Sequence, residues 1–234
     1  MLTLDLGNSS LKLACFEKGK LVNFFKTTSL LEIEKRVGDL PFIYCSVRKE
    51  DSSFLDQGYN VFEYFFGPNH SQFPINYAKT IGTDRLVAAY HAAHLKPETP
   101  VCVIDMGSFT TVDFAHSVHG FTGGFILPGR ALLHESYKKG AQLREYTLED
   151  EEYPPKSLPQ CSVTALSGGL SLSLLAPIEK ILKTYGAKEI FLTGGAAKGF
   201  VDTMKTKICR NANIHFDPYL IHHSLYSLSK KVME

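Results

Sequence analysis

The sequence predicts an α/β protein made of two related halves, each a mixed β-sheet with flanking helices. First, short apolar strand patterns alternate with helical patterns along the chain. Second, an Asp-x-Gly motif follows an apolar strand at Asp5 and again at Asp105, an offset of 100 residues. Third, a chain of 234 residues with 44% hydrophobic and 21% charged residues is typical of a globular protein that is large enough for a real core.

The first half is expected to begin as a β-meander and to end in a helix. Its predicted strands cover residues 2–6, 11–16, 21–26, 42–46 and 60–64. Ser29 can cap a short helix, and the apolar residues from Thr83 onward fall at helical spacing. Residues 96–100 contain two prolines and form a linker. We therefore expect an N-terminal domain at 1–98 and a C-terminal domain at 99–234.

The second half repeats the opening pattern and then becomes more helical. Its predicted strands cover residues 101–104, 110–114, 123–127 and 189–193. Pro128 opens a helix that is expected to reach about Leu143, and a long helix from Ser162 is expected to kink at Pro177. A final helix begins at Tyr219, and the sequence leaves open which half it packs on.

Charge and cysteine content exclude several classes of protein. Lys and Arg number 25 against 24 Asp and Glu, a formal net charge of +1, so we expect neither a nucleic acid nor a membrane as partner. The chain has no run of 18 apolar residues. Its five cysteines are scattered without a C-x-x-C pair, which argues against a zinc site or a disulfide framework. A cytoplasmic protein is expected.

The two Asp-x-Gly strand ends are candidate phosphate sites. Glycine lets backbone N–H groups approach a phosphate, Asn8, Ser9 and Ser10 supply donors, and the Asp5 carboxylate can hold a hydrated Mg²⁺ on a phosphate chain. A single such motif is more often an ordinary turn. Its duplication favours the phosphate interpretation. The sequence lacks both the P-loop and the Rossmann fingerprint, so a nucleotide would be held by hairpins.

Residues 82–85, Gly-Thr-Asp-Arg, stand at the start of the predicted helix and have two interpretations. Asp84 can simply be a cap of the helix, since an acid in the first turn complements the helix dipole. Alternatively, Asp84 is a general base and Arg85 binds an anion, which suits a substrate that carries both a hydroxyl and a carboxylate. The pair Gly194 and Gly195 after a strand is equally open: a helix-entry turn, or space for a nucleobase or ribose.

With these residues in place, the sequence resembles type III pantothenate kinase, of the acetate and sugar kinase/Hsp70/actin superfamily. The resemblance covers most of the chain and rests on residues 5–12, 82–85, 105–113 and 123–129, and on Ser162 with Ala165 and Gly169. It implies two ribonuclease H-like or actin-like ATPase domains. It also implies ATP-dependent phosphorylation of pantothenate to 4'-phosphopantothenate, the first step of coenzyme A biosynthesis.

The resemblance also assigns roles to individual residues. The ATP phosphates would be held by the first hairpin, through Asp5, Leu6, Gly7, Asn8, Ser9, Ser10, Leu11 and Lys12, and Ser108 would also touch ATP. Asp84 would be the proton acceptor. Pantothenate would be contacted by Tyr77, Gly82, Thr83, Asp84, Arg85 and Ser162. Asp105 would lie at a site for K⁺ or NH₄⁺.

The resemblance further implies a homodimer in which Ser162 completes the substrate site of the partner chain. Two alternatives remain at this stage. One is another small-molecule kinase of the same superfamily, and the other is a catalytically silent nucleotide-binding regulator. The second alternative is disfavoured because the chain has the candidate functional residues Asp5, Asp84, Arg85 and Asp105.

Overall fold

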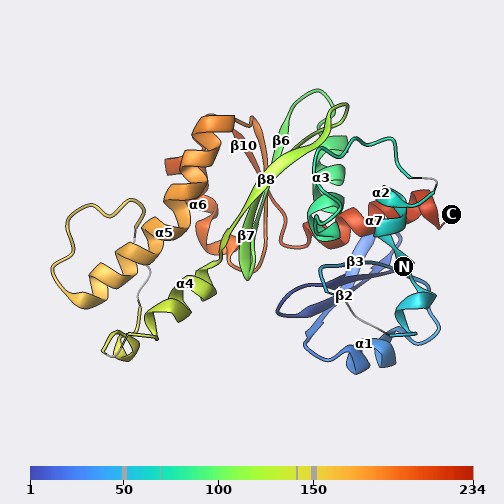
Figure 1. The fold of residues 1–234 in the computed structure, drawn as a ribbon, viewed down its shortest axis with the longest axis horizontal. Coiled ribbons are helices and arrows are strands. Elements are labelled where there is room, and N and C mark those ends of the chain that lie inside the picture. The colour runs from blue at the N-terminus through green and yellow to red at the C-terminus, as the bar shows by residue number, and fades with distance from the viewer. Residues whose placement is uncertain (49–51, 69, 141, 149–151, 234) are drawn as a thin grey trace. The chain divides into compact units, whose positions relative to one another are not determined.

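Two compact units make up the chain in a computed structural model that describes residues 1–48, 52–68, 70–140, 142–148 and 152–233 (Figure 1). Unit 1 comprises Met1–Pro100, Asp113–Gly123 and Tyr219–Glu234, and unit 2 comprises Val101–Val112 and Gly124–Pro218. Unit 1 therefore includes two segments that lie beyond the linker in the sequence. The division into domains at residues 98 and 99 stays a prediction.

The first sheet has the strand order β3-β2-β1-β4-β5. It is formed by β1 (Leu2–Leu6), β2 (Leu11–Glu17), β3 (Lys20–Thr27), β4 (Phe42–Ser46) and β5 (Tyr59–Asn60). β1 is antiparallel to β2, with Leu6 opposite Leu11, and parallel to β4, with Leu6 opposite Ser46. All five residues of β1 are buried. The carboxyl ends of β1 and β4 therefore meet at one edge, next to the β1–β2 turn.

The second sheet has the order β10-β9-β6-β7-β8. It is formed by β6 (Val101–Met106), β7 (Phe109–His116), β8 (Gly120–Pro128), β9 (Glu189–Thr193) and β10 (Asn213–Phe216). Read from β8 to β10, this order matches the first sheet strand for strand, with β6 in the place of β1. β6 and β9 are parallel, as are β1 and β4. The repeat predicted from the two Asp-x-Gly motifs is thus a repeat of topology.

Helices cover the sheets and connect their strands. They are α1 (Leu30–Val37), α2 (Val61–Phe66), α3 (Thr83–Leu95), α4 (Arg130–Tyr137), α5 (Ser162–Tyr185), α6 (Val201–Thr203) and α7 (Leu220–Val232). Short turns of 3₁₀-helix lie at Leu55–Gln57, Leu143–Glu145 and Ala197–Phe200, and a π-helical turn at Met204–Ile208. Within unit 1, α1 packs on β2 and β3 while α3 and α7 lie on the other side (Figure 1).

The final helix packs in unit 1, which answers a question that the sequence left open. α7 contacts β1, β4 and α3. Its buried face includes Leu225 and Leu228, and the ring of Tyr226 stacks on Phe16 of β2 with 4.5 Å between centroids. The C-terminal end of the chain therefore supports the same sheet from which the Asp5 turn emerges.

Two predicted elements are wrong. The strand expected at 60–64 is a helix from Val61, because the Asn60 side chain accepts a hydrogen bond from the backbone N–H of Phe62 and caps it. Val61 and Phe65, four residues apart, form its buried face. The helix expected to reach Leu143 ends at Tyr137. No residue of α4 is buried, so little tertiary packing supports a longer helix.

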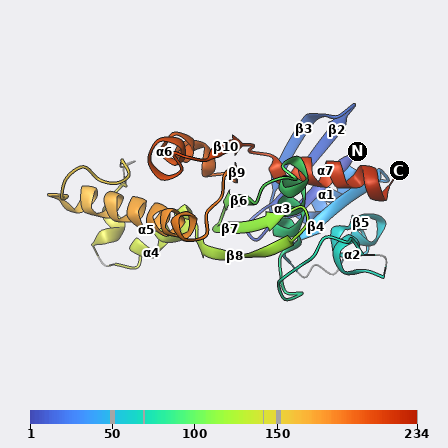
Figure 2. The same ribbon diagram turned by 90° about the horizontal axis from the view of Figure 1, so that it is seen from above.

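Among the residues that the structure describes, one helix is long and apolar enough by composition to cross a membrane. It is α5, Ser162–Tyr185, which has 56% of its most apolar window buried inside the protein. It packs beside α4 in unit 2 (Figure 2). A core helix passes the same test of length and hydropathy, so α5 is weak evidence for a membrane span.

Candidate active site

The first Asp-x-Gly turn joins β1 to β2 in unit 1. The backbone N–H of Gly7 donates to the carbonyl of Ser10 at 3.1 Å, which closes the turn. A Cβ atom on Gly7 would lie 3.1 Å from that same carbonyl, so a side chain fits poorly at this position. Asn8 and Ser9 are exposed at the tip, while Asp5 is 3% exposed at the end of the strand. The turn thus presents polar groups to solvent above a buried carboxylate.

The Asp5 carboxylate is held on both oxygens. Lys12 Nζ, from β2, donates to Oδ2 at 2.8 Å, and the Cys45 thiol, from β4, donates to Oδ1 at 3.8 Å. Burial raises the pKa of Cys45 well above its usual range, and the charge of Asp5 raises it further. Cys45 therefore stays a neutral thiol that donates. Because Lys12 and Cys45 come from the strands on either side of β1, the sheet itself orients the carboxylate.

The Gly-Thr-Asp-Arg motif begins α3 in the same unit. Gly82 is the extended residue before the helix, and a Cβ atom there would collide with Oδ1 of Asp84. Oδ1 of Asp84 accepts the backbone N–H of Arg85 at 2.8 Å. Asp84 therefore satisfies one N–H group of the first turn, as the structural interpretation expects. This bond occupies one carboxylate oxygen and leaves the general-base interpretation open.

The end of β4 connects the two motifs, and the sequence alone did not identify it. The backbone N–H of Ser46 donates to Thr83 Oγ1 at 3.0 Å, and the Thr83 hydroxyl donates to the carbonyl of Ser46 at 3.1 Å. Nη2 of Arg48 donates to the carbonyl of Asn8 at 2.7 Å. Residues 46–48 thus bond to the β1–β2 turn on one side and to α3 on the other. A buried strand followed by Ser-x-Arg was the available signal.

Arg85 is bound to an aspartate that the sequence placed in a motif without a role. Its Nε donates to both carboxylate oxygens of Asp113 at 3.1 Å, and its Nη2 donates to Oδ1 at 2.5 Å. The side chain of Arg85 is 7% exposed and that of Asp113 is 1% exposed. Burial acts to lower the pKa of the guanidinium, but the hydrogen bonds and charge of Asp113 outweigh it, and the pKa is raised. Arg85 is therefore a fixed cation.

Aromatic rings flank this cation. The guanidinium carbon of Arg85 lies 5.3 Å from the ring centre of Tyr77 and 5.7 Å from that of Phe121. Phe121 is fully buried, and Tyr77, 39% exposed, packs edge-on against it. The structure therefore brings Tyr77, Arg85 and the first-turn residues of α3 together in unit 1.

The second Asp-x-Gly turn joins β6 to β7 in unit 2. The Gly107 N–H donates to the carbonyl of Phe109, and the Gly129 N–H donates to that of Ser108, both at 3.1 Å. Gly194 has φ +97°, and a Cβ atom there would collide with Oδ1 of Asp105. Gly194 is thus a turn that passes directly beside the Asp105 carboxylate. Apart from its chain neighbours, no heavy atom of the described residues lies within 4 Å of a Cβ built on Gly195, so the space there is open.

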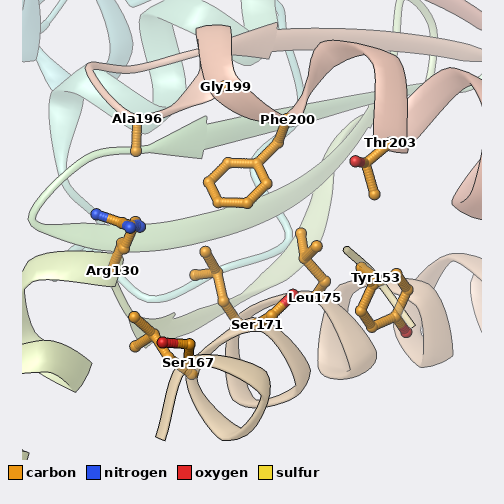
Figure 3. A pocket seen from close by; sticks show the side chains of 11 residues that line it. Arg130, Tyr153, Ser167, Ser171, Leu175, Ala196, Gly199, Phe200 and Thr203 are labelled. Carbon is orange, nitrogen blue, oxygen red and sulfur yellow. The ribbon is translucent and has the colours of Figure 1, made fainter. Parts of the chain in front are cut away.

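A cavity of about 310 Å³ lies in unit 2 between α5 and the helical turns after β9 (Figure 3). Its walls combine polar and apolar side chains, with Leu175 and Phe200 facing one another across it. Its polar groups include Arg130 and the hydroxyl of Ser171, which is buried without a hydrogen-bond partner in the described part of the chain. A cavity of this volume that combines apolar and polar groups has room for part of a small molecule.

Ser162 is the remaining residue that was predicted to contact pantothenate. Ser162 is the first residue of α5 and is exposed.

Among the described residues, no group of three or more His, Cys, Asp or Glu side chains has an arrangement that could hold a metal ion. A cation at Asp5 or Asp105 would therefore need oxygen ligands from a bound phosphate chain, the backbone or water, which is the usual mode for Mg²⁺.

Solved structures of other proteins align with this chain over its whole length and identify its fold. A protein from Campylobacter jejuni, described as a Baf family transcriptional activator, aligns with a TM-score of 0.70 at 23% identity over 100% of this chain and 99% of that one. The Alp12 filament structure aligns with a TM-score of 0.58 at 9% identity over 100% and 98%. With two mixed five-stranded sheets of the same order, the chain has the actin-like ATPase fold, and the predicted fold class is confirmed.

Sequence relatives narrow the class to a family. The type III pantothenate kinase family matches residues 42–184. The type III pantothenate kinase of Flavobacterium johnsoniae is 29% identical over 228 residues, 91% of this chain and 93% of that protein. That of Cytophaga hutchinsonii is 30% identical over 224 residues, 88% and 91%. The chain belongs to the type III pantothenate kinase family, a family of ATP-dependent kinases.

Proposed function

We propose that this protein transfers the γ-phosphoryl group of ATP to the primary hydroxyl of pantothenate and forms 4'-phosphopantothenate. Family membership supports the proposal, and one observation in the structure carries it. The phosphate turn at Asp5 and the helix start at Asp84 are hydrogen-bonded to the same short segment, residues 46–48. A phosphate-binding turn and a candidate base are thereby held in fixed relation within unit 1.

Phosphoryl transfer needs positioning and charge stabilisation more than covalent chemistry from the protein. In the proposed reaction, the turn of residues 7–10 binds the phosphates, with Asn8 and Ser9 exposed at its tip. Lys12 and Asp5 sit beneath them. Asp5 fits a role in holding Mg²⁺ because it is a hard oxygen ligand beside a turn without side-chain bulk at Gly7. When bound, Mg²⁺ would neutralise charge on the phosphate oxygens.

Asp84 and Arg85 would serve the acceptor. Asp84 takes the proton of the attacking hydroxyl while Arg85 binds the pantothenate carboxylate with Tyr77 beside it. Gly82 and Thr83 complete the contact surface at the start of α3. Ser162 would reach pantothenate in the partner chain of a homodimer. These assignments apply the family pattern, and the position of residues 82–85 at the start of α3 supports them for those four residues.

In unit 2, Asp105 and Ser108 would act on the nucleotide side. The Asp105 carboxylate, which lies against the Gly194 turn, suits a monovalent cation such as K⁺ or NH₄⁺ as an oxygen ligand. Ser108 would touch ATP. A cytoplasmic enzyme fits these substrates.

The experiment is a coupled assay of ATP consumption with and without pantothenate, in potassium and then in sodium buffer. Pantothenate-dependent ADP formation that is faster in potassium is the expected result. No ADP formation, together with measurable ATP binding, would instead favour a catalytically silent nucleotide-binding regulator. ADP formation with a different alcohol but not with pantothenate would favour another small-molecule kinase.

A further inference from the structure

Asp113 is a buried carboxylate to which the proposed reaction gives no role. It lies on β7, in the segment 113–123 that belongs to unit 1, and is 1% exposed. A buried carboxylate is costly unless it is paired and hydrogen-bonded. Its partner is Arg85, one of the residues proposed to bind the substrate.

The pairing fixes the orientation of Arg85. The contacts run through Nε and Nη2, so one edge of the planar guanidinium is committed to Asp113. Such two-point bonding holds an arginine in one geometry, which a single bond does not. The rings of Tyr77 and Phe121 lie near the guanidinium and restrict it further. Nη1 is the guanidinium nitrogen that these bonds to Asp113 do not use.

We propose that Asp113 is a positioning residue that orients Arg85 toward the substrate carboxylate and thereby sets the preference for an anionic over a neutral acceptor. The proposal rests on the proposed function. Arginine is long and flexible, so without the carboxylate the guanidinium would adopt several rotamers and bind an anion less well. A purely structural role for Asp113 would instead be to hold the segment 113–123 in unit 1.

The test compares two acceptors that differ only at the group Arg85 would bind. Pantothenate carries a carboxylate, and pantothenol carries a neutral hydroxymethyl group in its place. We expect Asp113→Asn to lower kcat/KM for pantothenate by about tenfold or more while kcat/KM for pantothenol changes little. The KM for ATP should stay at the wild-type value. Asp39→Asn, which removes the same charge at an exposed position, is the matched control.

The selectivity ratio separates the two roles. A structural role would lower activity with both acceptors and weaken ATP binding together with the melting temperature. An unchanged or increased pantothenate to pantothenol ratio in a folded Asp113→Asn protein overturns the proposal. If that variant does not fold, Asp113→Glu keeps the charge but shifts the carboxylate by one methylene, and a reduced ratio is again expected.

Two further outcomes are decisive. If neither variant folds, Asp113 serves stability alone and the proposal is overturned. If the wild-type protein phosphorylates neither acceptor, the proposed function fails and the positioning role falls with it. An active wild type whose variants keep full selectivity, by contrast, counts against the positioning role only.

Discussion

Asp84 is the residue at which a chemical and a structural role can be separated by one substitution. Its Oδ1 accepts the backbone N–H of Arg85, so part of its function is to satisfy the first turn of α3. Asparagine keeps an oxygen at this position but cannot take a proton. We expect Asp84→Asn to lose about 10²- to 10⁴-fold in kcat, the usual contribution of a general base, and to retain ATP affinity.

The controls for this substitution are thermal melting and equilibrium nucleotide binding. Both should match the wild type, because the amide oxygen preserves the bond to the Arg85 N–H. Near wild-type turnover would return Asp84 to the structural interpretation. A lowered melting temperature with proportional loss of ATP binding would do the same.

His222 makes the protein sensitive to acid. It is 2% exposed on α7, its Nδ1 is 2.8 Å from Thr3 Oγ1, and its Nε2 has no hydrogen-bond partner in the described part of the chain. Burial is the main cause that lowers the pKa of His222 to about 4 from an ordinary 6.5. Between these two pH values the unfolded chain binds a proton that the folded protein does not. Stability therefore falls as the pH falls through this range.

The predicted loss is about 3 kcal/mol of unfolding free energy between pH 6.5 and pH 4, from 1.36 kcal/mol for each pH unit of the difference. It is measured by urea unfolding at a series of pH values. His222→Asn does not titrate, so its pH dependence should be flatter by this amount, whatever its absolute stability. The exposed His70→Asn is the control. Parallel pH profiles for His222→Asn and wild type would contradict the prediction.

At the scale of elements, the link between β4 and α3 determines how the site is built. Thr83 is 4% exposed, and its hydroxyl both accepts from and donates to the backbone of Ser46. Thr83→Val keeps the shape and removes both bonds. We expect a loss of about 1–3 kcal/mol, the usual cost of leaving buried polar groups without partners. Urea unfolding measures the loss.

Thr83→Ser is the matched variant for this link. It keeps the hydroxyl, so it should be more stable than Thr83→Val although it is smaller. A valine variant as stable as the wild type would mean that the two hydrogen bonds contribute nothing net, and the β4–α3 link would then rest on apolar packing alone.

The sequence predicts elements well where the pattern is local. The strands at 2–6, 42–46 and 189–193 have the predicted bounds, and Ser29 caps α1 through the backbone N–H of Glu32 as expected. The predicted strand at 60–64 failed because its apolar residues suit either periodicity, and the cap at Asn60 decided for a helix. A short apolar run carries too little information to exclude either structure.

In the candidate site, the sequence predicts residues that are adjacent in the chain but not pairs that are distant in it. The turn at Asp5 and the helix start at Asp84 are visible as motifs because each is a continuous run of residues. Partners that are distant in sequence are not: Asp113 binds Arg85 from 28 residues away, and His222 reaches Thr3 from 219 residues away. Such pairs depend on topology, which brings α7 and the end of the β7–β8 hairpin into unit 1.

At the scale of the whole molecule, the two sheets share one strand order, so the duplicated Asp-x-Gly motif occupies equivalent places in both. The surroundings of the two aspartates nevertheless differ. Asp5 is bound by Lys12 and Cys45, whereas Asp105 lies against Gly194. One topology therefore provides two different carboxylate sites, which suits one site for a divalent cation on phosphates and another for a monovalent cation.

The proposed dimer gives the last prediction. Asp84 lies in unit 1 and Ser162 begins α5 in unit 2, where it is exposed. If Ser162 completes the substrate site of the partner chain, Asp84→Asn and Ser162→Val each inactivate a homodimer. A mixed dimer instead contains one site with both substitutions and one site with neither. Refolding the two variants together should therefore restore activity, whereas each variant alone stays inactive.

The expected recovery follows from symmetry. In an equal mixture, half of the dimers are mixed and each has one intact site of two, so activity should reach about a quarter of the wild-type value. Light scattering must report a dimer under the same conditions. If Asp84 and Ser162 instead act within one chain, every site in the mixture carries one substitution, and mixing restores nothing. The recovered fraction thus decides whether the substrate site is shared between two chains.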